Sequence, residues 1–240
     1  MSNQPRETIP AGKVHEESGK ATERTRAKLL AAAGEVFARA GYYNATIREI
    51  CALAGANVAA VNYHFRDKLG LYTEVLRKSV GVPQNQAVLK MFEQDTPPSE
   101  VLRHVIRAMV QRMCGTDRHE LNLRFQLMAQ ELARPSPVRS GVIDEAVRPI
   151  YTRMLALISS MLGLPPDDPK TRLCTHSVVG QIAHYVHARP VVAQLWPQQK
   201  MTPEQLDQIA EHIADFSLSY LEKAARNRRN KPARNVKRRK

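Results

Sequence analysis

Helix start signals recur along this chain and leave little room for any other secondary structure. Some place a Ser, Thr or Asp directly before a proline, which suits the N-cap and the first helical position. Others are capping boxes, in which an N-cap oxygen and an acidic or amide side chain three residues later satisfy backbone amides. No stretch shows strand alternation, so the sequence predicts an all-α fold of about nine helices. The signals are Thr46 with Glu49, Asp117 with Glu120, Ser136-Pro137, Asp168-Pro169 and Thr202-Pro203 with Gln205.

The predicted helices divide into a compact N-terminal group and a longer C-terminal group. Residues 1–21 mix charged and small residues without an apolar period, so we expect a flexible N-terminal arm there. Three or four short helices follow over residues 22–80, and longer ones over 81–225. Pro149 is expected to bend or interrupt one of the longer helices, because proline lacks the amide that an interior helical position needs.

Size and composition are those of a globular protein. The chain has 240 residues, of which 43% are hydrophobic, enough for a core of ordinary size. The three cysteines lie far apart and form no CxxC pair, which fits a reducing compartment. No stretch approaches the ~18 apolar residues of a membrane span, and the N-terminus lacks the apolar core of a signal peptide. We therefore expect a cytoplasmic protein without a membrane partner.

Positive charge is concentrated at the C-terminus. The net charge is +13, but residues 223–240 contain four Lys and six Arg and no acid, which leaves +3 for the rest of the chain. Residues 226–240 are expected to form a disordered basic tail. Such a tail is attracted to polyanions such as nucleic acid, and it equally fits a solvated chain end without a partner.

Residues 45–64 combine two capped helices with a short turn. Thr46 caps the first helix, Gly55 ends it as a residue free to adopt positive φ, and Asn57 caps the second. Two helices joined in this way are typical of the helix-turn-helix, whose second helix enters the major groove of DNA. The apolar residues expected to hold these helices in place are Ile50, Ala54, Val58, Val61 and Phe65.

Three polar residues of the second helix, Asn62, Tyr63 and His64, are left facing outward by this packing. An Asn side chain can both donate to and accept from an adenine edge, while Tyr and His can donate to phosphate oxygens. Thr46 adds a hydroxyl and backbone amides at a helix N-terminus, and Lys68 adds a charge at the start of the next helix. The pattern therefore predicts double-stranded DNA as a partner.

The sequence over about residues 22–80 resembles the DNA-binding domain of the TetR family of one-component regulators. The resemblance rests on the segment FARAGYYNATIREI, on the Ala-Gly turn that follows it and on the junction YHFRDK. It implies a homodimer that binds a palindromic operator. It also implies a small-molecule pocket and a dimer interface in the second half of the chain.

The resemblance further implies which residues contact DNA. Thr46 and Lys68 match phosphate-contacting positions, and Asn57 matches the polar cap of the recognition helix. Asn62 stands where many members have Tyr. The three residues before Val61 stand where members often have Ser, Lys, Gly or Thr, so base readout there is expected to be apolar, for example through thymine methyl groups. The predicted contacts are Thr46, Asn57, Val58, Ala59, Ala60, Asn62, Tyr63, His64 and Lys68.

The C-terminal half resembles the CecR-like subgroup of the same family, in the segments FQLMAQELARPSP and VVGQIAHYVHARPVV. Several members of that subgroup control transport or drug-sensitivity genes. The resemblance thus implies a ligand-released homodimeric repressor of such genes, associated with the bacterial nucleoid. The alternatives are an activator, or a protein that binds nucleic acid without specificity through its basic tail.

Two further sites are expected in the C-terminal half. Apolar walls with a few polar groups suit an effector pocket, although each candidate also fits an ordinary core. These pocket candidates are Phe125, Met128, Gln181, Tyr185 and Trp196. Small residues at a spacing of three, with a later apolar stripe, suggest a four-helix dimer interface, although packing within one chain explains them equally. These interface candidates are Ser177, Gly180, Ala183, Leu206, Ile209, Ile213, Phe216 and Tyr220.

Metal-binding and catalytic patterns find little support. His184 and His187 are three apart on one predicted helix, but only Cys174 stands near them as a further ligand, so we predict no metal site. The chain contains no G-x-S-x-G, phosphate loop or H-E-x-x-H pattern. We therefore predict neither an enzyme nor a bound cofactor.

Overall fold

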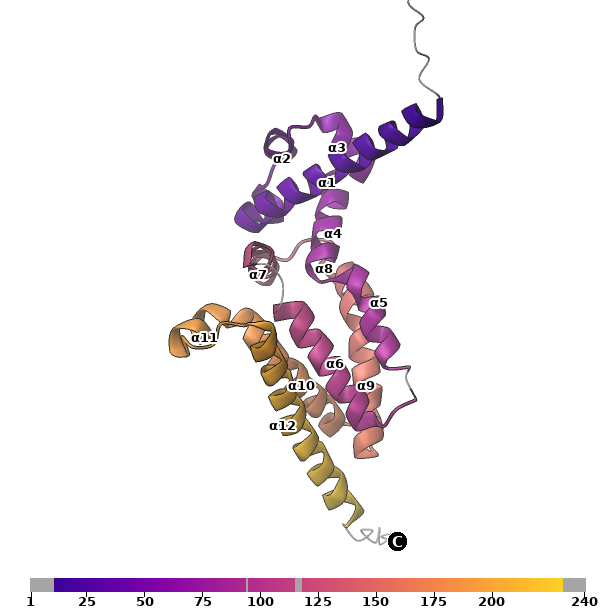
Figure 1. The fold of residues 1–240 in the computed structure, drawn as a ribbon, viewed down its shortest axis with the longest axis vertical. Coiled ribbons are helices and arrows are strands. Elements are labelled where there is room, and N and C mark those ends of the chain that lie inside the picture. The colour runs from indigo at the N-terminus through magenta and orange to yellow at the C-terminus, as the bar shows by residue number, and fades with distance from the viewer. Residues whose placement is uncertain (1–10, 94, 115–117, 231–240) are drawn as a thin grey trace, which may run out of the picture. The chain divides into compact units, whose positions relative to one another are not determined.

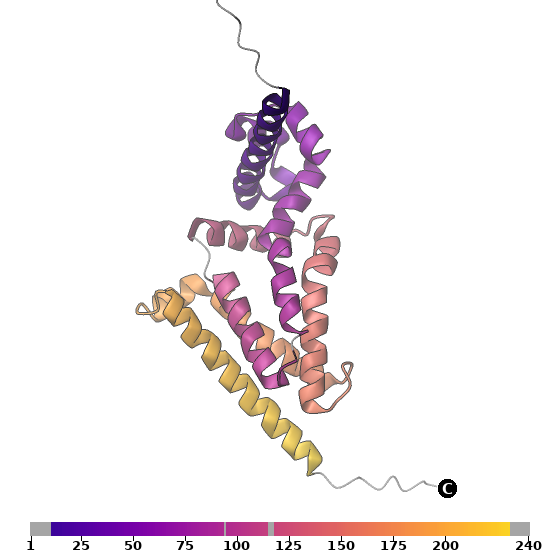
Figure 2. The same cartoon turned by 45° about the vertical axis from the view of Figure 1, so that its right-hand side comes forward.

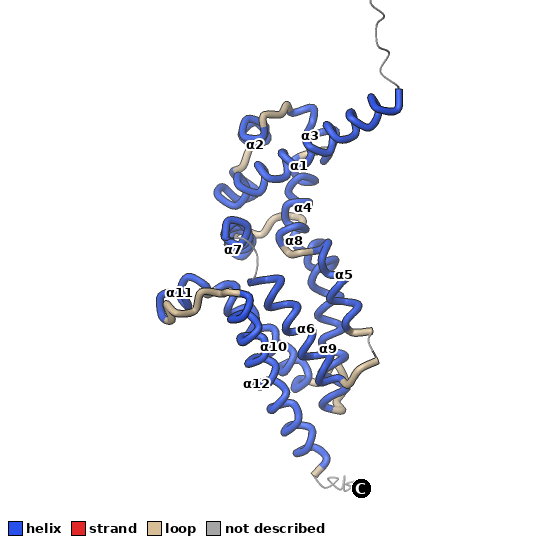
Figure 3. The backbone as a smooth tube through the Cα atoms, viewed as in Figure 1, coloured by secondary structure: helices blue, strands red, loops and turns tan. Residues whose placement is uncertain are grey.

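The structure is a computed structural model that describes residues 11–93, 95–114 and 118–230. All regular secondary structure within these residues is helical, as Figure 3 shows, which confirms the predicted all-α class. No helix in the described part of the chain is long and apolar enough to cross a membrane. The first helices are α1 (Ala11–Asn44), α2 (Ile47–Ala54), α3 (Val58–Phe65), α4 (Lys68–Ser79), α5 (Val82–Met91) and α6 (Pro98–Cys114). They are followed by α7 (Arg118–Ala133), α8 (Arg139–Val142), the π-helical segment η1 (Ile143–Val147), α9 (Arg148–Leu162), α10 (Pro169–His187), α11 (Arg189–Leu195) and α12 (Pro203–Arg229).

The chain packs as two compact units. Unit 1 comprises the chain up to Ser79 together with Gln126–Arg139, and unit 2 comprises Val80–Phe125 and the chain from Ser140 onward. The sequence predicted a single boundary near residue 80. In the structure, Gln126–Arg139 also belong to unit 1, which the sequence did not predict. One cause is a buried hydrogen bond of 2.5 Å, which the Tyr72 hydroxyl of α4 donates to the Glu131 carboxylate of α7. The assignment of DNA binding to residues 22–80, and of effector binding and dimerisation to residues 81–225, stays a prediction.

The core of unit 1 is formed by one apolar face each of α1 to α4. Its fully buried side chains include Phe37 from α1, Ile50 from α2, Val61 from α3 and Tyr72 from α4. The rings of Phe37 and Tyr72 meet edge to face, with centroids 4.7 Å apart. Because α2 and α3 have only eight residues each, they are too short to be stable alone, and this packing holds them in place.

Unit 2 is a bundle built around α6, α9, α10 and α12. Helix α12 has 27 residues and runs alongside α6 and α10 in both Figure 1 and Figure 2. The core between these helices contains Ile106 of α6, Met154 of α9, Ile182 of α10 and Ile213 of α12. The short helix α11, between α10 and α12, projects away from the bundle in Figure 1.

Helix α1 begins earlier than the sequence indicated. Residues 1–10 lie outside the described part of the chain, but Ala11–Ala21 belong to α1, whereas the sequence predicted a helix only from Thr22. This segment has no apolar stripe, but Ala, Lys and Glu are good helix formers.

The C-terminal end of α12 also differs from the prediction. The predicted disordered tail began at residue 226, but α12 continues to Arg229, and residues 231–240 lie outside the described part. Ala224 and Ala225 are still buried at this end. Arg228 donates a 3.2 Å hydrogen bond to the Leu162 carbonyl oxygen, at the C-terminus of α9. These contacts fix the last turns of α12 on the bundle.

Most predicted helix starts are confirmed. Asp168 accepts a hydrogen bond from the Lys170 amide at 2.8 Å, and Thr202 forms a complete capping box with Gln205. The predicted start at Ser136 is wrong, because the Ser136 amide donates to Glu131 and the next helix, α8, begins three residues later. Pro149 is the second residue of α9, two positions after η1 ends at Val147, so the predicted interruption of the long helix is confirmed. Helices α5 and α11 were not predicted.

Candidate nucleic-acid interface

The turn between α2 and α3 has the geometry that the sequence predicted. The Thr46 hydroxyl accepts from the Glu49 amide at 3.2 Å, and the side-chain oxygen Oδ1 of Asn57 accepts from the Ala60 amide at 2.9 Å. Gly55 ends α2 in the left-handed region, at φ 60°. The capping box at Thr46 is only half formed, because the Glu49 carboxylate forms an ion pair with Arg39 of α1.

Helix α3 is fixed by its inner face. Val61 and Phe65 are buried against α1 and α2, as predicted, whereas Val58 is exposed. The Arg26 guanidinium of α1 lies 5.3 Å from the centre of the Phe65 ring and forms a 3.0 Å ion pair with Glu74 of α4. This contact sets the rotation of α3 about its axis, because it holds one side of the helix against α1.

The outer face of α3 presents the predicted polar residues to solvent. Asn62 is exposed, and the Tyr63 side chain is 77% exposed. His64 is half-buried, and its ring meets the Tyr63 ring edge to face at 4.9 Å. These three residues offer an amide, a phenol and an imidazole over one turn, which are the groups that bind base edges and phosphates.

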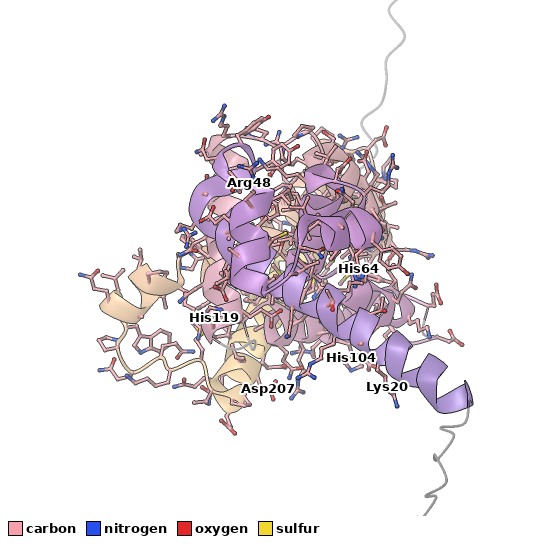
Figure 4. The ribbon with its side chains drawn as sticks, turned by 90° about the horizontal axis from the view of Figure 1, so that it is seen from above. Lys20, Arg48, His64, His104, His119 and Asp207 are labelled. Carbon is pink, nitrogen blue, oxygen red and sulfur yellow. The ribbon has the colours of Figure 1, made fainter. Side chains whose placement is uncertain are left out.

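A shallow groove of about 410 Å³ runs between α3 and the part of α1 that contains Ala21, Thr22 and Thr25. Three residues labelled in Figure 4 mark the helices of this surface: Arg48 on α2, His64 on α3 and Lys20 near the projecting end of α1. The α1 side of this groove was not among the predicted contacts. A sequence pattern could have predicted it, because Thr22 and Thr25 are hydroxyl residues three apart and therefore lie on one face of a helix. The groove is lined by Ala21, Thr22, Thr25, Asn57, Ala59, Ala60, Tyr63 and His64.

The two predicted phosphate contacts outside α3 lie in different environments. Thr46 is exposed at the start of α2. Lys68 is half-buried, and its ammonium lies 4.8 Å from the centre of the Tyr42 ring and donates to the Tyr43 carbonyl oxygen at 3.4 Å. Burial lowers the pKa of Lys68. An ammonium has three donors, so this contact leaves two for a phosphate.

The predicted pocket residues do not gather within one unit. Met128 belongs to unit 1, and the other four belong to unit 2. Gln181 donates to the Ser217 hydroxyl of α12 at 3.2 Å, and Tyr185 packs against the core. Phe125 and Trp196 are exposed. The pocket stays a prediction.

The predicted interface residues separate into two groups. Leu206, Ile209 and Ile213 are buried in the core of unit 2, so they pack within one chain. The others, Ser177, Gly180 and Ala183 on α10 and Phe216 and Tyr220 on α12, are exposed or half-buried. Phe216 is 63% exposed and Tyr220 is 54% exposed, and Leu173 of α10 is a further large apolar side chain exposed on this pair of helices.

The histidines of α10 have ordinary surroundings. Among the described residues, no group of three or more His, Cys, Asp or Glu side chains is placed to hold a metal ion. The His184 ring meets the Tyr185 ring at 5.6 Å, and His176 lies 3.4 Å from the Tyr151 hydroxyl. These histidines therefore have aromatic and hydrogen-bonding neighbours.

A capped helix pair whose second helix exposes base-reading and phosphate-binding groups defines a DNA-binding protein of the helix-turn-helix class. Residues 29–75 match the family model for bacterial regulatory proteins of the tetR family, and residues 98–220 match that for the C-terminal domain of the HTH-type transcriptional dual regulator CecR. The chain belongs to the TetR family of transcription regulators and carries a CecR-type C-terminal domain. This is a family of regulators and not of enzymes, as the sequence predicted.

Individual relatives agree with this assignment. The chain is 28% identical over 170 residues to the HTH-type transcriptional dual regulator CecR of Shigella flexneri, covering 67% of this chain and 74% of that protein. It is 29% identical over 128 residues to the HTH-type transcriptional repressor BepR of Brucella suis, covering 50% of this chain and 61% of that protein. The crystal structure of FadR from Bacillus subtilis in complex with stearoyl-CoA has the same fold, with a TM-score of 0.57 at 17% identity over 81% of this chain and 98% of that one.

Proposed function

We propose that this regulator is a ligand-responsive homodimer that binds a palindromic operator and acts mainly as a repressor of transport or drug-sensitivity genes. The observation that carries the proposal is the outer face of α3, where Asn62, Tyr63 and His64 lie side by side next to the groove with α1. The protein would act on chromosomal DNA in the bacterial cytoplasm. The relative BepR is named a repressor, which supports repression rather than activation.

The contacts divide into base readout and positioning. Asn62 is the candidate for reading a base, because its amide can pair with the major-groove edge of adenine. The methyl groups of Ala59 and Ala60 and the exposed Val58 suit thymine methyls. Tyr63, His64, Thr46, Asn57 and Lys68 would hold the phosphate backbone, and the hydroxyl of Thr25 would add a contact from α1.

The exposed face of α10 and α12 is the proposed dimer interface. Gly180 leaves open space beside α10, so a second helix can approach closely there. Phe216 and Tyr220 would supply apolar area, and the buried residues Leu206, Ile209 and Ile213 would support the face from within the chain. In such a dimer the two α3 helices would read half-sites one helical turn of DNA apart, ~34–36 Å.

A small molecule bound in the C-terminal half would release the DNA. FadR from Bacillus subtilis, which has this fold, was crystallised in complex with stearoyl-CoA, and this supports a small-molecule site in the fold. Within unit 2, the proposed lining is Gln181 and Tyr185, the two predicted pocket residues that are half-buried there. The effector acts only through its difference in affinity between the DNA-binding state and the released state.

Two alternatives have their own support. The relative CecR is named a dual regulator, so the protein could also activate some genes. Binding without specificity is the second alternative, because residues 231–240 carry six basic residues and no acid. If this segment contacts DNA, its deletion should lower affinity at low salt and flatten the salt dependence. An unchanged salt dependence would exclude that contact.

Genome-wide binding by the purified protein tests the proposal most directly. The expected result is a small number of sites that share a palindrome, confirmed by gel shifts against a scrambled sequence of equal length. Candidate ligands are then added to the gel shifts, and a ligand that releases the operator identifies the effector class. Equal affinity for the palindrome and the scrambled DNA would contradict a sequence-specific regulator.

A further inference from the structure

Lys68 rests on two adjacent tyrosines of α1. Its ammonium lies 4.8 Å from the centre of the Tyr42 ring and donates to the carbonyl oxygen of Tyr43. We call Tyr42 and Tyr43 the tyrosine shelf. A long lysine side chain would otherwise sample many rotamers, so the shelf limits the positions of the charge. The position of the shelf therefore sets the position of the ammonium.

The tyrosine shelf is itself held by residues 130–136, at the C-terminal end of α7 and just beyond it. The Tyr43 hydroxyl donates to the Pro135 carbonyl oxygen at 3.1 Å, and the Arg134 guanidinium lies 4.2 Å from the centre of the Tyr43 ring. We call residues 130–136 the latch segment. Two independent contacts to one side chain hold it at both its ring and its hydroxyl.

The backbone before the shelf also approaches the latch segment closely. Gly41 interrupts α1 at φ 72°, and a Cβ atom built there would lie 2.8 Å from the Gln130 side-chain oxygen. Only glycine suits both conditions. The latch segment therefore lies against Gly41 and contacts Tyr43, the two residues that flank Tyr42.

A buried carboxylate fixes the latch segment to α4. Glu131 is 2% exposed, accepts from the Tyr72 hydroxyl at 2.5 Å and accepts from the Ser136 amide at 3.2 Å. The Tyr72 ring in turn lies 5.1 Å from the Tyr42 ring. Both tyrosines of the shelf are thus reached from the latch segment, Tyr43 directly and Tyr42 through Tyr72.

Helix α7 connects this arrangement to the rest of the chain. It is one continuous helix from Arg118 to Ala133, of which the part up to Phe125 packs with unit 2 and the part from Gln126 packs with unit 1.

We propose that the latch segment positions the Lys68 ammonium for its phosphate contact through the tyrosine shelf, so that Arg134 and Tyr43 are positioning residues for DNA binding. This inference rests on the proposed function for the role of Lys68. A displaced latch segment frees the shelf, and the lysine charge is then no longer held where the phosphate lies. The loss is that of one phosphate contact and not of base readout.

The first test needs no DNA. The acylation rate of Lys68 by an N-hydroxysuccinimide ester is followed by peptide mass spectrometry in the wild type, in Arg134→Ala and in Tyr43→Ala. We expect severalfold faster labelling of Lys68 in both variants, because the amine leaves its half-buried site. Leu132→Ala is the matched control, since Leu132 lies in the same turn but is 75% exposed. An unchanged rate in both variants would overturn the proposal.

The second test is a double-mutant cycle on DNA binding with Arg134→Ala and Lys68→Ala. Each single variant should lower operator affinity and reduce the slope of log affinity against log salt by about 0.9, the value for one phosphate. The double variant should lose no more than Lys68→Ala alone, and Arg134→Lys should restore binding. Additive losses would show that Arg134 acts as a separate charge and would overturn the proposal.

The two tests separate this proposal from the proposed function. If the wild type does not distinguish its operator from scrambled DNA, the proposed function fails, while the labelling rates still decide whether the latch segment positions Lys68. If the operator is bound specifically but the labelling rates do not change, the latch proposal fails alone. Thermal unfolding of each variant shows whether unit 1 remains folded.

Discussion

At the scale of single residues, the recognition helix has one side chain suited to distinguish bases by hydrogen bonding over its exposed middle turn. Asn62 is exposed on α3, and the four residues before it in this helix are two valines and two alanines, without hydrogen-bonding side chains. Tyr63 and His64 have groups that suit phosphates better than base edges. Specificity by hydrogen bonding is thus concentrated at Asn62.

Asn62→Ala is expected to weaken specific binding more than non-specific binding. Removal of a bidentate contact to adenine costs about 1–3 kcal/mol of discrimination, whereas the phosphate contacts are unchanged. Lys68→Ala serves as the comparison, because it removes a charge and should weaken binding to both DNAs alike. Affinities for operator and scrambled DNA are measured by fluorescence anisotropy at two salt concentrations. Equal losses for both variants on both DNAs would contradict the separate roles.

Tyr72→Phe is expected to change how stability depends on pH. Burial, followed by the hydrogen bond to Glu131, raises the pKa of Tyr72 above its ordinary value of 10.0. The unfolded state therefore releases this proton first, so the wild type keeps its full stability below about pH 10 and loses up to ~1.4 kcal/mol per pH unit above it. The variant lacks this loss, although at neutral pH it should be less stable by about 1–3 kcal/mol because Glu131 loses a donor.

Urea unfolding of the wild type and of Tyr72→Phe from pH 8 to pH 11 measures this effect. The gap in the free energy of unfolding should be constant up to about pH 10 and should narrow above it. A gap that stays constant across the whole range would show that the Tyr72 proton is not held more tightly in the folded state.

At the scale of elements, the sequence predicted what depends on a few neighbouring residues. The caps at Asn57, Asp168 and Thr202 each bond to an amide two or three residues away, so the local sequence is sufficient to find them. The inward position of Val61 and Phe65 likewise follows from helical spacing. These features position α3 and its exposed polar face, which is the greater part of the candidate site.

The features that the sequence did not predict depend on contacts between residues that are far apart along the chain. Tyr72 and Glu131 are 59 positions apart, and no local pattern shows that α7 returns to the N-terminal unit. The groove beside α3 joins Thr22 and Thr25 of α1 to Tyr63 and His64 of α3, and no local pattern shows that these two predicted helices lie side by side. Leu206, Ile209 and Ile213 share a period with Phe216 and Tyr220, and only the packed bundle separates the buried residues from the exposed ones.

The α1 wall of the groove is tested by placing an acid in it. Thr25→Glu is expected to lower operator affinity roughly tenfold at low salt, because the new carboxylate repels the phosphate backbone, and to lose less at high salt. Ala31→Glu is the matched control, since Ala31 is exposed on α1 and does not line the groove. Gel shifts at two salt concentrations measure both variants. An equal effect of the two acids would show that α1 acts only through net charge.

At the scale of the whole molecule, binding to a palindrome requires two copies of α3 held at a fixed separation. A single copy of α3 reads one half-site, and linking two copies raises the effective concentration of the second copy once the first is bound. The exposed apolar side chains of α10 and α12 are the feature of unit 2 that a second protomer would cover. The dimer face is therefore expected to contribute to operator affinity although it lies on unit 2, which does not contain α3.

Phe216→Glu tests this relation between assembly and DNA binding. Phe216 is 63% exposed in the single chain, so the change should leave the fold intact while it places a charge in the dimer interface. We expect a monomer in analytical ultracentrifugation at micromolar concentration and a loss of roughly 10²- to 10⁴-fold in operator affinity, the range that avidity supplies. Ile143→Glu is the control, because Ile143 is also exposed but lies in η1. A Phe216→Glu protein that remains dimeric and binds the operator like the wild type would show that α12 does not form the interface.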